Sequence, residues 1–442
     1  MVSGYRPGGD RFARALIAAA PERVGVVTAA VGLGVTVSGL DGATGDLVHI
    51  GDDHADIAQV VATGEQTLTC MPLHATSSHP VGTPVRPALN PPLVPTGAGL
   101  RGRVIDGLGR PIDGKGPLRP DAYVPLEHKT PNPMARTRID TPLTLGVKAM
   151  DTLLTVGRGQ RMGLFAGSGV GKSSLLSMIA RGTDAELTVI ALIGERGREV
   201  REFLEDDLGA EGLARSIVVV STSDEPALMR VRAAFLATRV AEAARDAGQD
   251  AVLMMDSLTR VAMAQREIGL SAGEPPATRG YPPSTFSVLA SLLERAGTDY
   301  TGSITGLYTV LVDGDDHNEP VADAARSILD GHVVLDRKLA INGHFPSIDV
   351  LASVSRLASK LNTVEQSAAA RTFRQVLSAR RGAQDLLDVG AYKPGANPTV
   401  DAGVAYEETM NEFLQQTMTE QTTAASAWSE LTAVTSVLGG VR

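Results

Sequence analysis

The segment GLFAGSGVGKSSLL, from Gly163 to Leu176, joins an apolar run to a helical pattern through a glycine-rich turn. The apolar residues before the turn predict a buried strand, and the SLLSMIA that ends the segment and continues beyond it predicts a helix. A glycine turn between a strand and a helix points backbone N–H groups at an anion, and the helix N-terminus favours negative charge there. The segment therefore predicts a phosphate-binding loop in an α/β domain.

The residues of this loop have individual predicted roles. Lys172 supplies positive charge for the β- and γ-phosphates of a nucleotide, and Ser173 offers a hydroxyl to Mg²⁺. Ala166 replaces the first glycine of the strict pattern, which costs little where its φ is negative. The predicted ATP-binding residues are Gly167, Ser168, Gly169, Val170, Gly171, Lys172, Ser173 and Ser174, and Lys172 is also a catalytic candidate.

Two carboxylates follow other apolar runs. Asp256 ends AVLMMD, and the carboxyl end of a buried strand is where open α/β sheets bind ligands. We expect Asp256 to hold Mg²⁺ through water, with a helix N-cap as the alternative. Glu195 follows LTVIALIG and is predicted to orient the attacking water, with a solvated loop carboxylate as the alternative. Arg196 is a further catalytic candidate, as a partner behind this site or as a surface charge.

Apolar runs alternate with helical patterns through the middle of the chain. The runs at 187–194, 216–222 and 251–257 are short and continuous, and residues 225–248 between the last two have a helical period. Buried strands that alternate with helices predict a mostly parallel sheet covered on both faces.

The two ends of the chain have different patterns. Alternating apolar residues from Val31 to Val37, followed by glycine turns, predict a small β-barrel over residues 23–95. Six prolines between His79 and Gly99 indicate a linker or an edge segment rather than a central strand. We expect an α/β domain over 96–360 and a helical domain over 361–442, which includes a helix over 406–421 with Met410, Phe413 and Leu414 on one face. Residues 1–22 predict a tail with a short helix, either frayed or docking a partner.

Composition narrows the class of protein. The chain has 442 residues, of which 43% are hydrophobic and 21% charged, so two or three soluble domains are expected. A net charge of −9 argues against nucleic acid as the main partner. Cys70 is the single cysteine, which fits a reducing compartment. No signal-peptide pattern and no apolar run of membrane-spanning length is found, so we expect a cytoplasmic protein.

Together with the loop, Glu195 and Asp256, the segment PSIDVLASVS (346–355) resembles the signature of rotary ATP synthase catalytic subunits. The resemblance implies a RecA-like P-loop motor domain. It also implies that Arg356, directly after the segment, is the arginine finger that reaches the γ-phosphate in a neighbouring subunit. Phe345 takes the place of an aromatic residue that stacks on adenine, with a core phenylalanine as the alternative.

Longer segments indicate one branch of this superfamily. GEPPATRGYPPSTF (273–286), the stretch 302–340 and HFPSIDVLASVSR (344–356) closely resemble the type III export ATPases, and DDHNEP (315–320) favours the flagellar type over the injectisome type. The proline-rich GEPPATRGYPP is excluded from regular helix or sheet, and we expect it at a subunit interface or a pore.

The resemblance implies a homohexameric Mg²⁺-dependent ATPase that energises type III protein export at the inner face of the cell membrane. A single chain carries both Glu195 and Arg356, so identical subunits can complete one another's sites in a ring. The implied partners are a stalk-like regulator at the N-terminal helix, a central stalk protein, an export gate, and chaperones with their export substrates.

Three rival functions remain open from the sequence. A true ATP synthase subunit would need a second, non-equivalent subunit. An RNA-dependent ATPase like the transcription terminator Rho would use aromatic stacking platforms, yet residues 24–69 contain no Phe, Tyr or Trp. A scaffold subunit that binds nucleotide without turnover is disfavoured because Lys172, Glu195 and Arg356 are all present.

Overall fold

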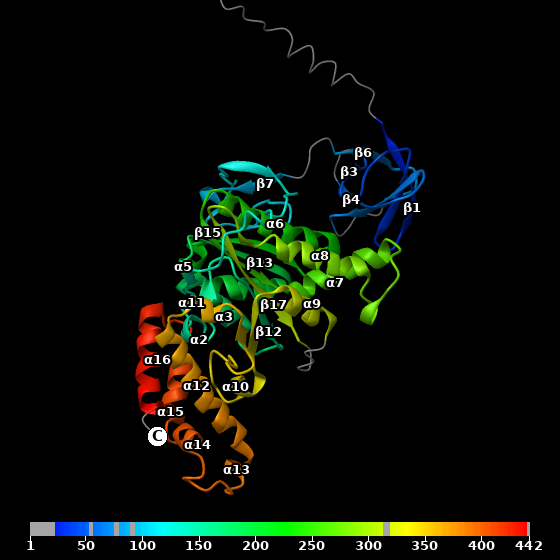
Figure 1. Cartoon of the computed structure of the whole chain (residues 1–442). Helices are drawn as coiled ribbons and strands as arrows, with labels where there is room; N and C mark the ends of the chain where they lie inside the picture. Colours follow the sequence, from blue (N-terminus) through cyan, green and yellow to red (C-terminus); the bar gives the residue numbers. More distant parts are fainter. Residues whose placement is uncertain (1–22, 53–55, 75–78, 89–92, 313–318, 440–442) are drawn as a thin grey trace, which may run out of the picture. The chain divides into compact units, whose positions relative to one another are not determined.

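The computed structural model describes residues 23–52, 56–74, 79–88, 93–312 and 319–439, and the chain divides into two units, residues 1–91 and 92–442 (Figure 1). The predicted docking helix in residues 1–22 and most of the DDHNEP stretch, residues 315–318, lie outside the described residues.

The first unit is a closed six-stranded barrel, which confirms the sequence prediction. Buried and more exposed residues alternate along its strands, so one set of side chains fills the interior. Cys70 lies in that core with 0% exposure, and burial raises the pKa of its thiol to about 12. The strands follow the spatial order β1 (Gly25–Val31), β2 (Gly34–Ser38), β5 (Thr67–Pro72), β4 (Asp56–Thr63), β3 (Leu47–Ile50) and β6 (Pro84–Pro87).

The prediction that the proline-rich segment holds no central strand was wrong for β6. This strand pairs with both β1 and β3 and so closes the barrel. Its prolines occupy the first and last positions, and the two residues between them keep their backbone donors. Pro84 still contributes an acceptor, because its carbonyl receives a hydrogen bond from the Gly51 N–H at 2.9 Å.

A nine-stranded, mostly parallel sheet organises the second unit, as predicted. β19 and β16 are its two antiparallel members. The central strands are buried along nearly their whole length, which requires cover on both faces. The spatial order is β19 (Val354–Ser355), β18 (Gly331–Leu335), β12 (Arg161–Ala166), β17 (Ser303–Leu311), β15 (Asp250–Asp256), β13 (Leu187–Glu195), β14 (Ser216–Thr222) and β8 (Val104–Ile105), with β16 (Gly297–Thr298) against β17.

Helices follow these strands as the alternating sequence pattern predicts. Two short ribbons, β7 (Leu93–Thr96) with β9 (Ala122–Pro125) and β10 (Pro142–Leu143) with β11 (Val156–Gly157), complete the unit. Its described helices before residue 362 are α2 (Lys148–Thr152), α3 (Lys172–Gly182), α4 (Gly197–Glu202), α5 (Gly209–Ala214), α6 (Ala227–Asp246), α7 (Leu258–Ser271), α8 (Pro283–Glu294), α9 (Pro320–Ile328), α10 (Arg337–Ile341) and α11 (Ala358–Leu361), with the 3₁₀ turns η1 (Ala98–Leu100) and η3 (Thr278–Gly280) and the π-helical turn η2 (Phe203–Leu208).

One hydrophobic core joins the sheet to the C-terminal helices. It contains inward residues of the central strands such as Leu164 and Met254, Leu176 of α3, and Phe373 and Phe413 from the C-terminal region. Helix α6 packs on β13, β14 and β15, and none of its residues belongs to this core cluster, so α6 covers the opposite face. The C-terminal helices are α12 (Val364–Gly382), α13 (Gln384–Asp388), α14 (Pro398–Ala405), α15 (Glu407–Leu414) and α16 (Ala424–Gly439).

Helix α15 is shorter than its sequence pattern predicts. Met410, Phe413 and Leu414 share a buried face as expected, but the helix ends at Leu414 rather than continuing through the following glutamines. Tertiary contacts of Gln416 end the helix. The Gln416 N–H donates to the Phe345 carbonyl at 2.9 Å, and the Gln416 side chain forms hydrogen bonds with the backbone of Lys148 and Gly146. These bonds hold the chain in an extended conformation.

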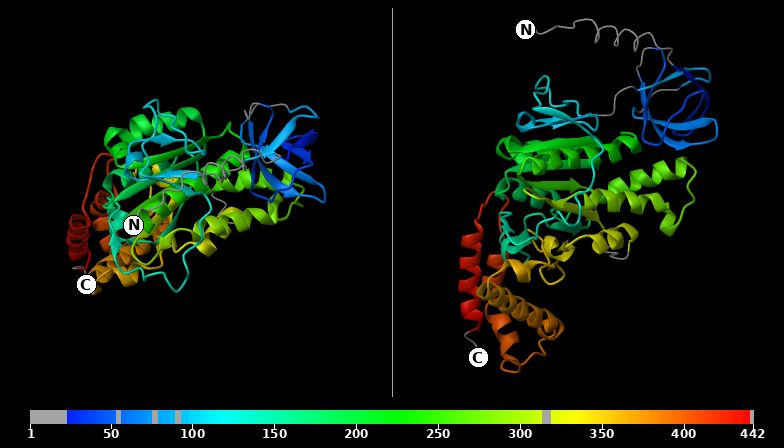
Figure 2. Two further views of the ribbon diagram at one scale, coloured as in Figure 1. Left: turned by 90° about the horizontal axis from the view of Figure 1, so that it is seen from above. Right: turned by 45° about the horizontal axis from the view of Figure 1, so that its top comes forward.

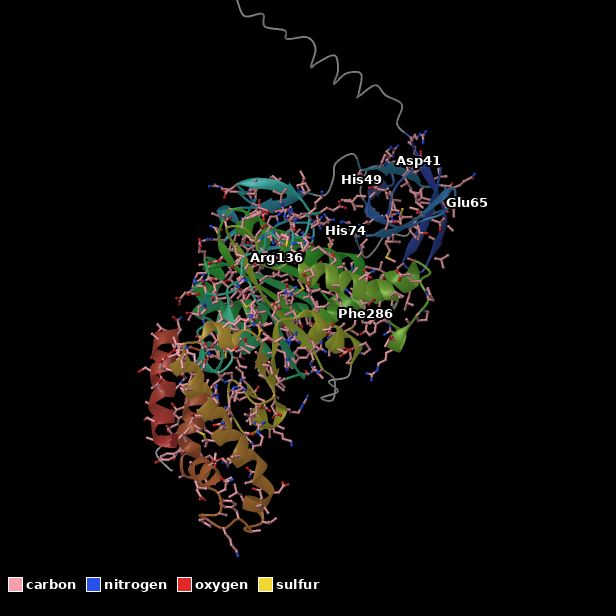
Figure 3. All side chains as sticks on the ribbon, in the orientation of Figure 1. Asp41, His49, Glu65, His74, Arg136 and Phe286 are labelled. Carbon is pink, nitrogen blue, oxygen red and sulfur yellow. The ribbon has the colours of Figure 1, made fainter. Side chains whose placement is uncertain are left out.

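Helices α7 and α8 pack against each other, and their ends at the connecting loop project beyond the sheet of the second unit (Figure 2). Phe286 lies on α8 (Figure 3). Its ring meets that of Tyr281 edge to face, with ring centroids 6.2 Å apart. The proline-rich loop between the two helices contains only the short turn η3, as the prolines predict. No helix in the described part of the chain is both long and apolar enough to cross a membrane.

A substitution at Phe373 tests the hydrophobic core that joins the C-terminal helices to the sheet. It is 0% exposed and lies edge to face with Phe413, with centroids 5.5 Å apart. We expect Phe373→Ala to lower the free energy of unfolding by about 3–5 kcal/mol, because it leaves a cavity. The fluorescence of the single tryptophan, Trp428 on α16, during urea unfolding measures it.

Val389, 75% exposed, supplies the matched control, and Val389→Ala should leave the midpoint unchanged. Equal midpoints for Phe373→Ala and the wild type would contradict a shared core.

Candidate nucleotide-binding site

The predicted phosphate loop lies between β12 and α3 at the carboxyl edge of the sheet. Gly169 and Gly171 have φ values of 75° and 90°, a region that favours glycine. A Cβ on Gly167 would lie 2.9 Å from the Arg337 guanidinium, so a side chain there would displace this arginine. Ala166 lies outside the left-handed region, which confirms that alanine is tolerated at the first position.

A buried serine from a distant segment supports the loop. Ser347 is 1% exposed, and its hydroxyl donates to the Val170 carbonyl at 2.6 Å. The segment around Ser347 is itself fixed to β18, because the Asp336 N–H donates to the Ser347 carbonyl and the Asp349 N–H to the Val334 carbonyl. The loop therefore rests on a hydrogen-bonded support.

Lys172, which follows β12, contacts two predicted site residues at the ends of β13 and β15. Its ammonium donates to Asp256 Oδ1 at 2.5 Å and to Glu195 Oε1 at 3.3 Å. Burial disfavours its charge, yet the two carboxylates together outweigh this effect and raise the pKa of Lys172. The lysine is therefore charged at neutral pH, in the middle of the site.

Glu195 is flanked by a second carboxylate that the sequence analysis did not include. Burial raises the pKa of Glu195; Lys172 opposes this increase, while Asp256 and a hydrogen bond with Glu199 add to it. Arg196 pairs with Glu199 at 3.1 Å, and its side chain is 78% exposed. Arg196 therefore does not join Lys172 and lies on the solvent side of Glu199.

Phe345 lies beside the loop and outside the core. Its ring carbons are 3.4–3.5 Å from the position that a Cβ on Gly171 would take, and the residue is 45% exposed. The alternative of a core phenylalanine was therefore wrong. The backbone bond from Gln416 to the Phe345 carbonyl also brings the C-terminal region next to this ring.

Arg356 lies at the other end of the strands from the loop of its own subunit. Ser355 pairs with Gly331 at the amino end of β18, whereas Ala166 pairs with Leu335 at the carboxyl end of that strand. The four residue steps from Gly331 to Leu335 span about 13 Å, more than an extended arginine side chain covers. The guanidinium instead donates to the Arg326 carbonyl at 3.2 Å.

Several residues at the site were missed by the sequence analysis. Thr309 donates to Asp256, Ser347 supports the loop, and Arg260 of α7 packs against Gly194, where a Cβ would lie 2.9 Å from that of Arg260. These residues come from elements far from the loop in sequence, and no local pattern marks them. Arg260 was the easiest of the three to find from the sequence, since it follows Asp256 by only four residues, in the first turn of α7.

The donor set fits Mg²⁺ with a nucleotide phosphate. Ser173 follows Lys172 in the first turn of α3 and Asp256 accepts a hydrogen bond from Lys172, so a hydroxyl and a carboxylate belong to residues at the end of the phosphate loop. Within the described residues no group of three or more His, Cys, Asp or Glu side chains forms a metal cage. A magnesium ion held by few protein oxygens and by water and phosphate matches this arrangement.

A parallel α/β sheet with a phosphate loop, carboxylates at the ends of two other strands and a lysine between them defines a P-loop nucleotide hydrolase. Residues 146–355 match the model of the ATP synthase alpha/beta family, nucleotide-binding domain, and residues 363–433 match that of the T3SS EscN ATPase C-terminal domain.

Known proteins of this type are similar over nearly the whole chain. The flagellum-specific ATP synthase of Bacillus subtilis is 50% identical, covering 94% of this chain and 95% of the relative. The type 3 secretion system ATPase of Xanthomonas euvesicatoria is 44% identical, covering 94% of each. The assembled ATPase EscN of enteropathogenic E. coli has a TM-score of 0.87 and 39% identity, covering 93% of this chain and all of that one.

EscN has also been solved in complex with its central stalk EscO, and that structure has a TM-score of 0.86 and 40% identity, with coverage of 93% and 100%. The chain belongs to the family of flagellum-specific ATP synthases and type 3 secretion system ATPases, and it is an ATPase with a RecA-like nucleotide-binding domain.

Ser347→Ala tests the support of the phosphate loop. Loss of a buried hydrogen bond worth about 1 kcal/mol should loosen the loop and weaken ATP binding by roughly five-fold. Equilibrium titration with a fluorescent ATP analogue measures the change.

Ser177→Ala is the matched control, because Ser177 is also buried and donates to a backbone carbonyl, that of Ser174 within α3. Equal weakening by the two substitutions would mean that Ser347 acts on stability alone.

Proposed function

We propose that this chain is a Mg²⁺-dependent ATP hydrolase that forms a homohexameric ring and energises type III protein export, in particular of flagellar components. The main support for this proposal is that Lys172, Glu195 and Asp256 meet at the carboxyl edge of the sheet, whereas Arg356 lies at its opposite end. Such a subunit presents several residues of a hydrolytic site at one end of the sheet and the proposed arginine finger at the other.

Each residue then has a role in hydrolysis. Lys172 and the N–H groups of residues 167–174 bind the phosphates, and Phe345 stacks on the adenine. Ser173 and Asp256 hold Mg²⁺, which neutralises charge on the β- and γ-phosphate oxygens. Glu195 accepts a hydrogen bond from the attacking water, and Arg196 acts on it only through Glu199.

Arg356 acts on a neighbouring subunit's γ-phosphate in this proposal. A contact between one subunit's site and another subunit's Arg356 is head to tail, and it closes into a ring when the rotation is complete. An arginine that neutralises transition-state charge accelerates phosphoryl transfer by about 10³–10⁵-fold. The isolated subunit would therefore turn over slowly.

The family relatives support the wider assignment. Flagellum-specific ATP synthases and type 3 secretion ATPases are both similar to the chain, and we assign the flagellar branch as the first choice and the injectisome as the alternative. We propose an assembly at the inner face of the cell membrane with a central stalk protein and a stalk-like regulator. The export gate, chaperones and substrates complete the partners, and the loop 273–283, mostly exposed over residues 273–280, faces a pore or a subunit interface.

The pKa of Glu195 sets the pH dependence of turnover. A carboxylate that accepts a bond from water must be ionised, and burial with Asp256 and Glu199 nearby raises the pKa of Glu195 above its ordinary value. Activity should therefore fall, as the pH is lowered, at a higher pH than for an ordinary glutamate. The pH profile of kcat measures this.

Glu195→Gln should lose turnover by at least about 10²-fold while it still binds ATP, since removal of such a group costs that much. A Glu195→Gln variant with near wild-type turnover would remove this residue from the mechanism.

Mixed rings test the arginine directly. Arg356→Ala and Glu195→Gln should each be nearly inactive alone. An equal mixture should regain about a quarter of the sites, because a site recovers where a subunit with Glu195 meets a neighbour with Arg356. Turnover after mixing and reassembly, alongside sizing of each variant, measures this.

The outcome that contradicts the proposal is an Arg356→Ala protein with turnover independent of concentration and close to the wild type. Stimulation of turnover by RNA would instead favour the Rho-like alternative.

A further inference from the structure

The magnesium-binding candidate Asp256 is held from a neighbouring strand. Thr309 of β17 donates its hydroxyl to Asp256 Oδ1 at 2.8 Å. The two strands are parallel neighbours, and their last paired residues, Met255 and Tyr308, directly precede Asp256 and Thr309. The register of the sheet therefore brings the threonine opposite the carboxylate.

The Thr309 hydroxyl donates its hydrogen bond to the Asp256 carboxylate rather than to a backbone carbonyl. The other acceptor within reach is the Met255 carbonyl at 3.3 Å, and a hydroxyl has one proton to donate. A charged oxygen at 2.8 Å is the stronger acceptor, because hydrogen bonds to ionised groups are shorter and roughly twice as strong. The same Oδ1 also accepts from Lys172, so one oxygen of Asp256 has two donors.

The burial of Thr309 indicates that its hydroxyl does more than fill space in the core. The residue is 0% exposed, and its neighbours along β17 are Tyr308 and Val310, both fully buried. Burying a hydroxyl costs free energy unless the group is hydrogen-bonded, and valine has nearly the same shape without that cost. Packing alone would therefore favour valine at this position.

We infer that Thr309 is a positioning residue that fixes the orientation of the Asp256 carboxylate toward Mg²⁺. The inference rests on the proposed role of Asp256 at the metal. With Oδ1 bonded to Thr309, rotation of the carboxylate about its Cβ–Cγ bond breaks a charge-assisted hydrogen bond. Thr309 thus acts through Asp256 and touches neither nucleotide nor metal.

The test compares two substitutions at Thr309 with one matched control. Thr309→Val removes the hydroxyl and keeps the shape, and Thr309→Ser keeps a hydroxyl in a smaller side chain. Thr305→Val is the control, because Thr305 lies four residues earlier on β17, is 1% exposed, and its hydroxyl accepts from the Gly159 N–H at 2.9 Å. It removes a buried hydroxyl from the same strand at a distance from Asp256.

The measurement is binding of a fluorescent ADP analogue to the full-length protein over a series of Mg²⁺ concentrations, without turnover. We expect Thr309→Val to raise the Mg²⁺ concentration for half-maximal enhancement of binding by roughly ten-fold. Binding without Mg²⁺ should be unchanged. Thr309→Ser should stay near the wild type, and so should Thr305→Val even where it lowers the unfolding temperature.

Asp256→Asn, measured in parallel, tests the metal role of Asp256 separately from the positioning role of Thr309. If Asp256→Asn shifts the Mg²⁺ dependence and Thr309→Val leaves it at the wild-type value, the positioning role is overturned and the metal role of Asp256 stands. If Asp256→Asn itself leaves the dependence unchanged, the proposed metal role fails and the inference falls with it. An equal shift in Thr309→Val and Thr305→Val would also overturn it.

Discussion

The contact between Lys172 and Asp256 constrains the whole nucleotide-binding unit. Lys172 begins the helix after β12 and Asp256 ends β15, and β17 lies between these two strands. The charges can meet only if all three strands are parallel and in a fixed register, with their carboxyl ends level. A buried ion pair stabilises a protein only when its remaining hydrogen bonds are made, and Thr309 and Glu195 supply them here. The central sheet is therefore organised around this pair of charges.

A second constraint lies in the segment from His344 to Arg356. Ser347 supports the phosphate loop, and Phe345 lies against Gly171. Farther along, Asp349 pairs with Arg381 of α12 at 2.9 Å, and the Arg374 guanidinium of α12 donates to the Val350 carbonyl at 2.6 Å. The helical region is thus anchored on the same segment that contacts the nucleotide site. This explains why the C-terminal helices belong to the same compact unit as the sheet.

The sequence predicted the features that depend on local pattern. The phosphate loop, the buried strands, the barrel and the position of Asp256 at a strand end all follow from periodicity and glycine placement. Features set by distant contacts were not predictable in the same way. Thr309 meets Asp256 across 53 positions, and only the register of β15 and β17 brings them together. The end of α15 was misplaced because Gln416 bonds to residues 71 to 270 positions away.

The segment 344–356 also connects two different sites in the proposed ring. Its first part contacts the phosphate loop of its own subunit, and its last residue is the arginine that serves the next site. Between them the chain is hydrogen-bonded to β18 and its flanking residue, since the Val334 N–H donates to Ser353 Oγ and the Arg356 N–H to the Asp330 carbonyl. Ser355 further donates to the Thr155 carbonyl at 2.7 Å. A displacement of the loop support at Ser347 would therefore strain the hydrogen bonds that hold this segment beside β18. In the proposed ring, nucleotide binding in one subunit and the placement of Arg356 for its neighbour would therefore be linked by one hydrogen-bonded stretch of chain.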